Sequence, residues 1–453
     1  MPRSTLIVRV FVALLASLAL GYIWIIVSAK LEIGGASPNQ QRLGTLPGVR
    51  PHAVSQDCTG VKVTAQGTWL VGRVTNEYEQ LEPSSERVDL NGLLDGELRS
   101  EPETTVVARL GADGVFKQVA QVSGSACLVA SAEGARVFLL SSLYRPNDAG
   151  GQNAVFRSDD QGKTWRWVAD GFFPEVSGVA TLVSPYFYNQ DEVWASRWAD
   201  DVEPQAGVYY SADGGAHSTP ITVPQPLAVT QDYAHSLRPD IQEWRDSTEQ
   251  LTHVLQQDAQ HAVIWVSQRF WGSHPDGKSD NLAIGVTTRV QLKRTAGTWQ
   301  VEDIQRENGL YISELADNGA GRVIGLIDQG PHGRAVVAEL NTATLAWKTV
   351  GDLPSVFSPL SADTQARGLW VGRNSLVVNT YSDHKPPRWL YWWSEASISA
   401  DAVFYSTDWG HSWKRLSLDG YMGVRGFDGA SDRVFWSKQN YADDTLIQAY
   451  GLR

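Results

Sequence analysis

Two eight-residue stretches decide the fold, SDDQGKTW at residues 158–165 and STDWGHSW at residues 406–413. Both follow the pattern Ser-x-Asp-x-Gly-x-(Thr/Ser)-Trp. A third stretch, SADGGAHS at residues 211–218, keeps the Ser, the Asp and the Gly but lacks the Trp. Each stretch directly follows a short run of apolar and aromatic residues, AVFR, GVYY or AVFY. Such runs favour strands, so the pattern predicts a turn that recurs at strand ends.

The residue types in the pattern suit a tight turn. An Asp side chain accepts hydrogen bonds from the backbone N–H groups that follow it. Gly adopts the positive φ that such turns require, and Trp anchors the next strand in an apolar core. The residues to which we assign this structural role are Ser158, Asp160, Gly162, Trp165, Ser211, Asp213, Gly215, Ser406, Asp408, Gly410 and Trp413.

The pattern resembles the Asp-box, or BNR, repeat of sialidase-like β-propellers, a superfamily that also contains photosystem assembly factors. The resemblance implies an all-β ring of four-stranded blades, with the motif between the two outer strands of a blade. It also places the motif away from the active face. Asp160 and Asp408 are therefore expected to hold turns rather than to catalyse a reaction.

A second recurrence supports a propeller. Short β-branched or aromatic runs follow polar turns seven times, at 67–73, 135–142, 191–197, 261–269, 321–328, 367–373 and 432–438. One run per four-stranded blade predicts seven blades over residues 54–453. Six blades are the alternative, because sialidases of this motif family have six. Residues 59–65 and 444–453 are the expected closing strands, and residues 237–256 suggest a short helix inserted in a loop.

The first thirty residues carry a membrane signal. Val10 to Val27 contain no charge and are long enough to cross a bilayer. Arg3 and Arg9 precede this stretch, so the positive-inside rule predicts a single pass through the inner membrane with the C-terminal domain in the periplasm. The alternative is a signal peptide, cleaved after Val27-Ser28-Ala29, and a secreted or periplasmic domain. Residues 31–53, rich in Gly, Pro and polar residues, predict a flexible linker.

Charge and composition exclude some functions. The net charge is −12, and no Lys/Arg cluster is present, whereas a nucleic-acid-binding protein needs such a cluster. No sequence motif for a metal or a cofactor occurs, so we expect neither. The two cysteines, Cys58 and Cys127, form either one disulfide in an oxidising compartment or two separate thiols.

The sequence predicts the activity less clearly than it predicts the fold. Sialidases bind the substrate carboxylate with three arginines and use a Tyr–Glu pair and an Asp, but the family's Arg-Ile-Pro motif is missing here. Four arginines end strand-like runs and either bind an anion in the central funnel or pair locally: Arg73, Arg197, Arg269 and Arg373. We therefore expect a non-enzymatic binding or assembly scaffold for a protein or glycan partner, with a sialidase-like exo-glycosidase as the alternative. The aromatic stretch RWLYWWSEAS at 388–397 is a candidate contact surface.

Overall fold

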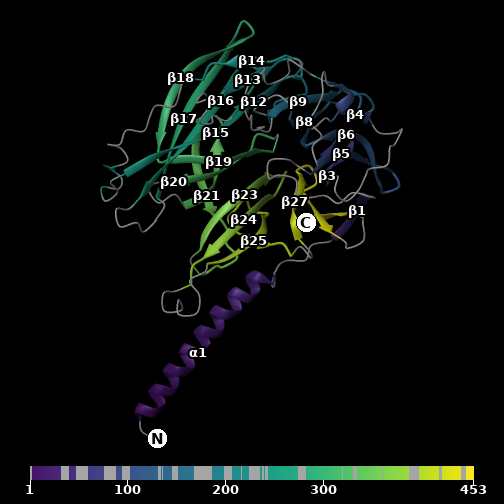
Figure 1. Cartoon of the computed structure of the whole chain (residues 1–453). Coiled ribbons are helices and arrows are strands. Elements are labelled where there is room, and N and C mark those ends of the chain that lie inside the picture. The colour runs from purple at the N-terminus through teal and green to yellow at the C-terminus, as the bar shows by residue number, and fades with distance from the viewer. Residues whose placement is uncertain are drawn as a thin grey trace.

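The structure is a computed structural model, and Figure 1 shows a ring of β-sheets from which one long helix projects. The described strands form seven sheets, six with four strands and one with five. The residues that the structure describes are 3–31, 40–46, 60–75, 88–93, 103–130, 134, 136–144, 151–167, 186–197, 207–215, 217–223, 235–236, 239, 243–273, 282–318, 320–329, 334–360, 362–386, 397–417, 421–439 and 445–452.

The helix and the first three sheets have the following bounds. The helix is α1 (Arg3–Lys30). The first sheet contains β2 (Val61–Thr64), β3 (Gly67–Thr75), β5 (Glu103–Leu110), β6 (Phe116–Ser123) and β4 (Val88–Asp89), with a 3₁₀ turn at Leu90–Leu93. The second contains β7 (Ser125–Ala130), β8 (Val137–Tyr144), β9 (Gly151–Ser158) and β10 (Arg166–Trp167). The third contains β11 (Tyr186–Phe187), β12 (Val193–Arg197), β13 (Gly207–Ser211) and β14 (Thr219–Ile221).

The remaining four sheets follow in chain order. The fourth contains β15 (Glu243–Gln256), β16 (His261–Ser273), β17 (Leu282–Thr295) and β18 (Thr298–Asn308). The fifth contains β19 (Leu310–Asp317), β20 (Val323–Gln329), β21 (Arg334–Asn341) and β22 (Ala346–Asp352). The sixth contains β23 (Asp363–Val371), β24 (Leu376–His384), β25 (Ile398–Ser406) and β26 (Lys414–Arg415). The seventh contains β27 (Tyr421–Asp428), β28 (Arg433–Gln439), β29 (Thr445–Gly451) and β1 (Gln40–Leu46).

Each sheet is an antiparallel meander of consecutive strands, which is the blade of a propeller. Two sheets depart from this plan: in the first, β4 adds to the outer edge of β6 in parallel, and in the seventh, β1 supplies the outer strand. The sequence predicted seven blades, with six as the alternative. The described strands give six four-stranded sheets and one five-stranded sheet, each packed on the next.

Apolar side chains between neighbouring sheets form the core and close the ring. Trp69 of the first sheet packs with Phe156 of the second, and Phe138 of the second with Val193 of the third. The third to seventh sheets are joined by further clusters of the same kind. Phe435 of the seventh sheet then packs with the first sheet. Large side chains on the second strands, such as Trp69 and Phe435, are fully buried, which explains the recurring aromatic runs in the sequence.

The ring is closed by a segment that the sequence predicted to be a linker. β1 lies within residues 31–53 and pairs antiparallel with β29, from Gln40 opposite Tyr450 to Leu46 opposite Thr445. The predicted closing segment 59–65 instead supplies β2, which pairs with β3 in the first sheet. The polar composition of β1 does not predict a strand. An outermost strand buries little apolar surface and therefore needs few apolar residues.

Two other expectations need correction. The seven recurring runs were expected to be equivalent, but six of them lie in the second strands of their sheets and the run at 367–373 lies mainly in β23, a first strand. Residues 237–256 were expected to hold a short helix, yet β15 occupies 243–256 and pairs with β16 on both sides of an irregularity between Asp246 and Gln250. Cross-strand pairing outweighs the moderate helix propensity of its Glu, Gln, Arg and Leu residues.

Candidate functional site

The three Ser-x-Asp-x-Gly stretches form the same turn between the third and fourth strands of the second, third and sixth sheets. In the first of them, the Ser158 hydroxyl donates to Asp160 at 2.9 Å and accepts the Gly162 N–H at 2.7 Å. Asp160 also accepts the backbone N–H and the hydroxyl of Thr164, at 2.8 and 2.6 Å. Gly162 has a φ of 84°, which favours glycine. The carboxylate is therefore fully used by the turn.

The turn at Asp213 uses a different partner. His217 stands where the other two turns have Thr or Ser, and its Nδ1 lies 2.7 Å from the Asp213 carboxylate. Burial opposes ionisation of Asp213, but hydrogen bonds from His217 and Ser211 outweigh it and lower the pKa of Asp213 to about 2. The turn at Asp408 behaves similarly, because hydrogen bonds led by that of Ser412 lower the pKa of Asp408 to about 2.

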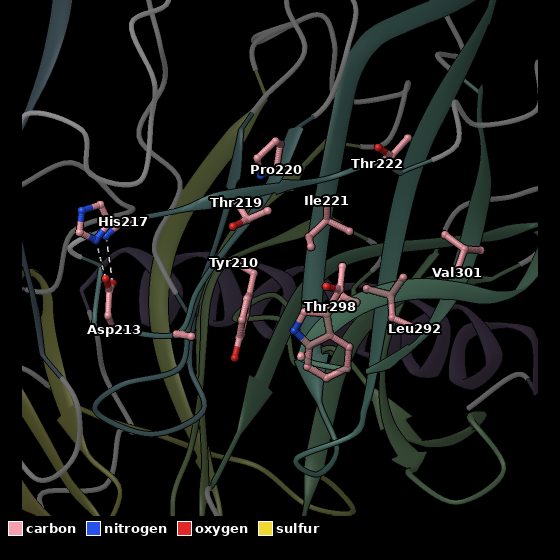
Figure 2. A pocket seen from close by; sticks show the side chains of 13 residues that line it. Tyr210, Asp213, His217, Thr219, Pro220, Ile221, Thr222, Leu292, Thr298 and Val301 are labelled. Atoms are coloured by element: carbon pink, nitrogen blue, oxygen red, sulfur yellow. Dashed lines mark hydrogen bonds and ion pairs between the residues drawn. The ribbon is translucent and has the colours of Figure 1, made fainter. Parts of the chain in front are cut away.

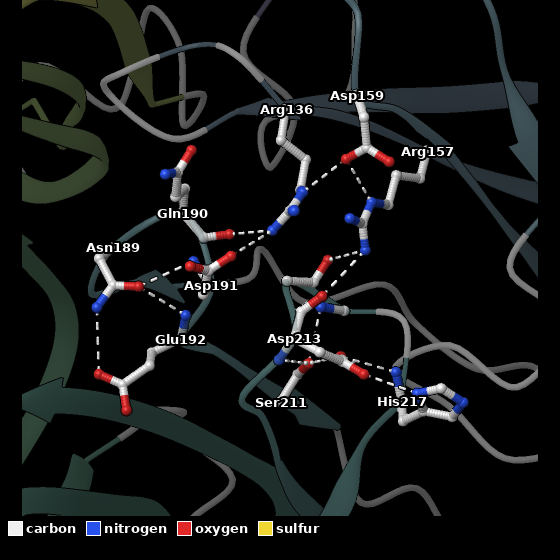
Figure 3. A network of polar contacts seen from close by, with 12 residues as sticks. Arg136, Arg157, Asp159, Asn189, Gln190, Asp191, Glu192, Ser211, Asp213 and His217 are labelled. Carbon is white, nitrogen blue, oxygen red and sulfur yellow. Dashed lines mark hydrogen bonds and ion pairs between the residues drawn. The ribbon is translucent and has the colours of Figure 1, made fainter.

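An ion-pair network joins two of these turns across the interface between the second and third sheets (Figure 3). Asp159 accepts from Arg136 and from Arg157, each at 2.8 Å. Arg157, which is almost fully buried, also donates to the carbonyls of Asp213 and Gly214 at 3.0 Å. These charge-assisted hydrogen bonds hold the two sheets together. The network is structural.

A groove of about 540 Å³ opens beside the Asp213 turn, between the third and fourth sheets (Figure 2). The buried rings of Tyr210 and Trp299 form its floor, and Asp213 and His217 lie at one end. Apolar and hydroxyl side chains make up the walls, which are lined by Thr219, Pro220, Ile221, Thr222, Leu292, Thr298 and Val301. Concave sites that combine aromatic surface with a few polar groups are typical of binding sites.

The floor is held rigidly from below. Trp194, Tyr210 and Trp299 form an aromatic cluster with ring centroids 4.8 to 5.7 Å apart. Glu192 accepts the Tyr210 hydroxyl and the Arg294 guanidinium, both at 2.5 Å. The Arg294 guanidinium also lies 5.4 Å from the Tyr210 ring centroid. Burial opposes ionisation of Glu192, but these donors outweigh it, so its pKa is lowered.

Beyond the floor, the groove continues as an uncovered apolar stripe on β18. Val301 lies opposite Leu292, and Ile304 opposite Val290, with a bulge between the two pairs. Leu292 and Val290 are both buried against the third sheet, so Val301 and Ile304 share their face. Val301 is nevertheless 42% exposed and Ile304 43% exposed, because β14 of the third sheet is only three residues long.

The edge of β18 is also open. Among the described strands it pairs only with β17, and at eleven residues it is the longest outer strand. Four of the other outer edges are protected, because β10 and β26 have two residues, β14 contains Pro220, and β4 covers β6. The remaining outer strands, β22 and β1, have seven residues each and are shorter than β18. Short strands, proline and added strands are the means by which proteins protect sheet edges. β18 has none of these.

Of the four arginines predicted to line the funnel, the two whose side chains the structure describes, Arg269 and Arg373, lie apart. Arg73 and Arg197 lie in the second strands β3 and β12, and their side chains are outside the described part of the structure. Arg269, toward the end of β16, pairs with Asp328 and covers the Tyr311 ring at 3.9 Å. Arg373 lies in the turn between β23 and β24, where its N–H donates to Gly429.

That turn is at the opposite end of the sheet from the ends of the second strands. Arg373 is thus separated from Arg269 because its run belongs to a first strand rather than a second one. Cys127 lies in β7, whereas Cys58 and the aromatic stretch 388–397 fall largely outside the described residues, so the disulfide stays a prediction. Among the residues described, no three His, Cys, Asp or Glu side chains are grouped to hold a metal.

Comparisons with known proteins leave the family open. No protein-family profile and no curated protein matches the sequence. A GH74 xyloglucanase from Xanthomonas campestris has 14% identity and a TM-score of 0.41, over 90% of this chain and 54% of that one. An alpha-L-arabinanase from Penicillium chrysogenum has 10% identity and a TM-score of 0.35, over 92% and 99%. The chain thus spans about half the length of the xyloglucanase, and these likenesses carry no argument about activity.

Proposed function

We propose that this chain is a membrane-anchored propeller of the Asp-box type that binds an extended segment of a protein partner along β18. The observation that carries the proposal is the open edge of β18 with Val301 and Ile304 exposed on it. Within the described domain outside α1 and Leu31, the only other exposed large hydrophobic residue is Tyr188. An extended peptide that adds to a sheet edge gains main-chain hydrogen bonds, and its alternate side chains enter neighbouring pockets.

The side chains along β18 indicate which residue types a partner segment would carry. Alternate side chains of an added strand would lie beside Val301, Ile304 and the floor at Trp299. These surroundings favour apolar residues at those positions of the partner. The outward face of β18 carries Glu302, which is exposed, and the whole chain has a net charge of −12. Complementary charge speeds association and excludes wrong partners. We therefore propose a partner segment in which apolar and basic residues alternate.

Anchoring by α1 is part of this proposal. Val10–Lys30 is long and apolar enough to cross a membrane. Ala29, next to the candidate cleavage position, is 2% exposed, and Arg415 donates to the carbonyls of Ser28 and Ala29 at 3.0 Å each. These contacts support retention of the helix, because cleavage would remove the acceptors of a partly buried arginine. The orientation with the domain in the periplasm rests on Arg3 and Arg9.

The test uses the full chain in lipid nanodiscs and a fluorescent octapeptide in which Val and Lys alternate. We expect anisotropy to report saturable binding. Methylation of the peptide nitrogens along one edge should abolish binding, whereas methylation along the other edge should not, because only one edge faces β18. Loss of binding with methylation of either edge equally would contradict strand addition.

Variants locate the peptide on the protein. The double variant Val301→Ser with Ile304→Ser should weaken binding by about tenfold or more, since two exposed apolar contacts are lost. Ala346→Ser on β22, an exposed position of the fifth sheet's outer strand, is the matched control and should bind as the unchanged chain does. Equal loss in both proteins would place the peptide elsewhere.

A sialidase-like exo-glycosidase is the second candidate, and one cluster favours it. Asp328 is 6% exposed, and burial raises its pKa against the opposing effect of Arg269. Tyr311 lies under the same arginine. A buried carboxyl, a tyrosine and an arginine are the groups that such hydrolases use. Release of fluorophore from a sialoside, lost in Asp328→Asn, would favour the hydrolase; no release would leave the binding function as the better account.

A further inference from the structure

The end of α1 is fixed to the sixth sheet rather than free. Arg415 of β26 donates to the carbonyls of Ser28 and Ala29, at 3.0 Å each, and Lys30 donates to the carbonyl of Ser399 in β25. The last carbonyls of a helix lack intrahelical partners, and a cation at this end is favourable for the helix dipole. The final turn of α1 is therefore capped by the domain.

A second contact lies further back along the helix. The Tyr22 hydroxyl is 3.2 Å from Nε2 of His384, and the centroids of the two rings are 5.7 Å apart. His384 is the last residue of β24 and is 4% exposed. Its ring also packs against Phe357, with centroids 5.5 Å apart. The end of the β24–β25 hairpin thus runs beside α1 instead of stopping at its C-terminus.

The rise per residue of α1 indicates how deep the contact between Tyr22 and His384 would lie in a membrane. Tyr22 precedes Lys30 by eight residues, which is about 12 Å along a helix axis. A bilayer's hydrocarbon core is about 30 Å thick and needs roughly 20 helical residues. The apolar span is Val10–Lys30, and the part before Tyr22 would cover only about 18 Å. The span reaches across the core only if the level of Tyr22 and His384 lies inside the bilayer.

We infer that the end of the sixth sheet at His384 and Lys385 enters the membrane leaflet beside α1. The lipid bilayer is therefore a second partner of the domain, which is held in one orientation by two elements. This inference rests on the proposed anchoring by α1. It leaves β18 available, because Figure 1 places β18 on the side of the ring away from the helix.

The sequence that follows His384 has a composition that is typical of membrane surfaces. Residues 385–397 read KPPRWLYWWSEAS, with three Trp and one Tyr close to a Lys and an Arg. Trp and Tyr are enriched where membranes meet water, and Lys and Arg keep their charges at the headgroups while their stems lie in apolar surroundings. Lys385 itself is exposed, so its stem can lie among the lipid chains and carry the ammonium toward the headgroups.

Photocross-linking tests the inference in the full chain, reconstituted in nanodiscs of phosphatidylcholine and phosphatidylglycerol with a fluorescent phospholipid. Benzoylphenylalanine replaces Lys385, Leu14 or Glu302 in separate proteins. We expect lipid adducts at Lys385 and at Leu14 of α1, and none above background at Glu302 of β18. Adducts at Leu14 without adducts at Lys385 would overturn the inference while the anchor stands. No adduct at Leu14 would instead refute the anchoring on which it rests.

A second variant tests whether docking of α1 sets the depth. Arg415→Gln removes the guanidinium that holds Ser28 and Ala29, and the exposed Lys414→Gln on the same strand is the matched control. The adduct at Lys385 should fall in the first protein and persist in the second, while the Leu14 adduct persists in both. A Lys385 adduct unchanged by Arg415→Gln would contradict a fixed orientation.

Discussion

At the scale of single residues, the carboxylates of the Ser-x-Asp-x-Gly stretches have a structural role. Asp160 accepts hydrogen bonds from Ser158 and twice from Thr164. The same bonds recur at Asp408 with Ser406 and Ser412. Since every donor comes from the turn itself, the pattern in the sequence is sufficient to form it. This is why short stretches predicted the local structure well.

The turn predicts a measurable loss of stability on substitution. Asp160→Ala removes three hydrogen bonds of the turn, two of them exposed to water, so the free energy of unfolding should fall by about 0.5–1.5 kcal/mol. Lys163→Ala, in the same turn but with an exposed side chain, should change it by less than about 0.5 kcal/mol. Urea unfolding of the full chain in detergent measures both. Equal effects of the two variants would contradict the turn's role.

Acid should weaken the turn at Asp213 in a defined range. The folded-state pKa of this carboxyl is about 2, below its ordinary value of 3.8. A lowered pKa contributes stability above the ordinary value, and this contribution is lost as the pH falls toward 2. Asp213→Asn should therefore reduce the loss of stability between about pH 4 and pH 2. Thermal unfolding across that range measures it, and an unchanged acid dependence would argue against the assignment.

The sequence does not predict the apolar stripe on β18, and the reason is physical. Trp299, Val301 and Ile304 are spaced by two and then by three residues, so the alternation typical of a strand is broken. The bulge between Val301 and Ile304 restores a common face. The broken spacing beside the Ala296-Gly297 turn was the available signal, but only the pairing with β17 shows its meaning.

At the scale of elements, the strand that closes the ring comes from far away in the sequence. β1 precedes the first sheet but pairs with β29, so the two ends of the domain are held by backbone hydrogen bonds. Neither its polar composition nor its position predicted a strand. The opposite error concerns β15, a 14-residue strand with many helix-forming residue types that pairs with β16. Non-local pairing decided both cases.

Closure by β1 predicts that its backbone N–H groups matter more than its side chains. Thr45→Pro together with Leu46→Pro removes two adjacent N–H groups, one of which points toward β29 because they alternate along a strand. The unfolding free energy should fall by about 1–3 kcal/mol. Thr45→Val with Leu46→Val keeps both N–H groups and should retain stability. Similar unfolding curves for the two proteins would show that closure does not depend on this pairing.

At the scale of the whole molecule, the propeller architecture was predictable and the binding edge was not. Repeated turns and aromatic runs, such as those ending at Trp165 and Trp413, predicted sheets that pack on their neighbours. The exposure of Val301 depends on β14 being short and on β18 being long. The docking of α1 depends on Arg415 meeting Ser28 and Ala29. Such properties arise from contacts between elements that no local pattern encodes.

Hydrogen exchange tests the central claim, the open edge of β18, most directly. The full chain in nanodiscs would be exchanged with and without the alternating Val–Lys octapeptide, and peptides covering 298–308 would be compared with those covering β22. We predict that the octapeptide slows exchange along β18 and leaves β22 unchanged, because an added strand takes up the free N–H groups of one edge. Unchanged exchange along β18 at saturating octapeptide would contradict the account.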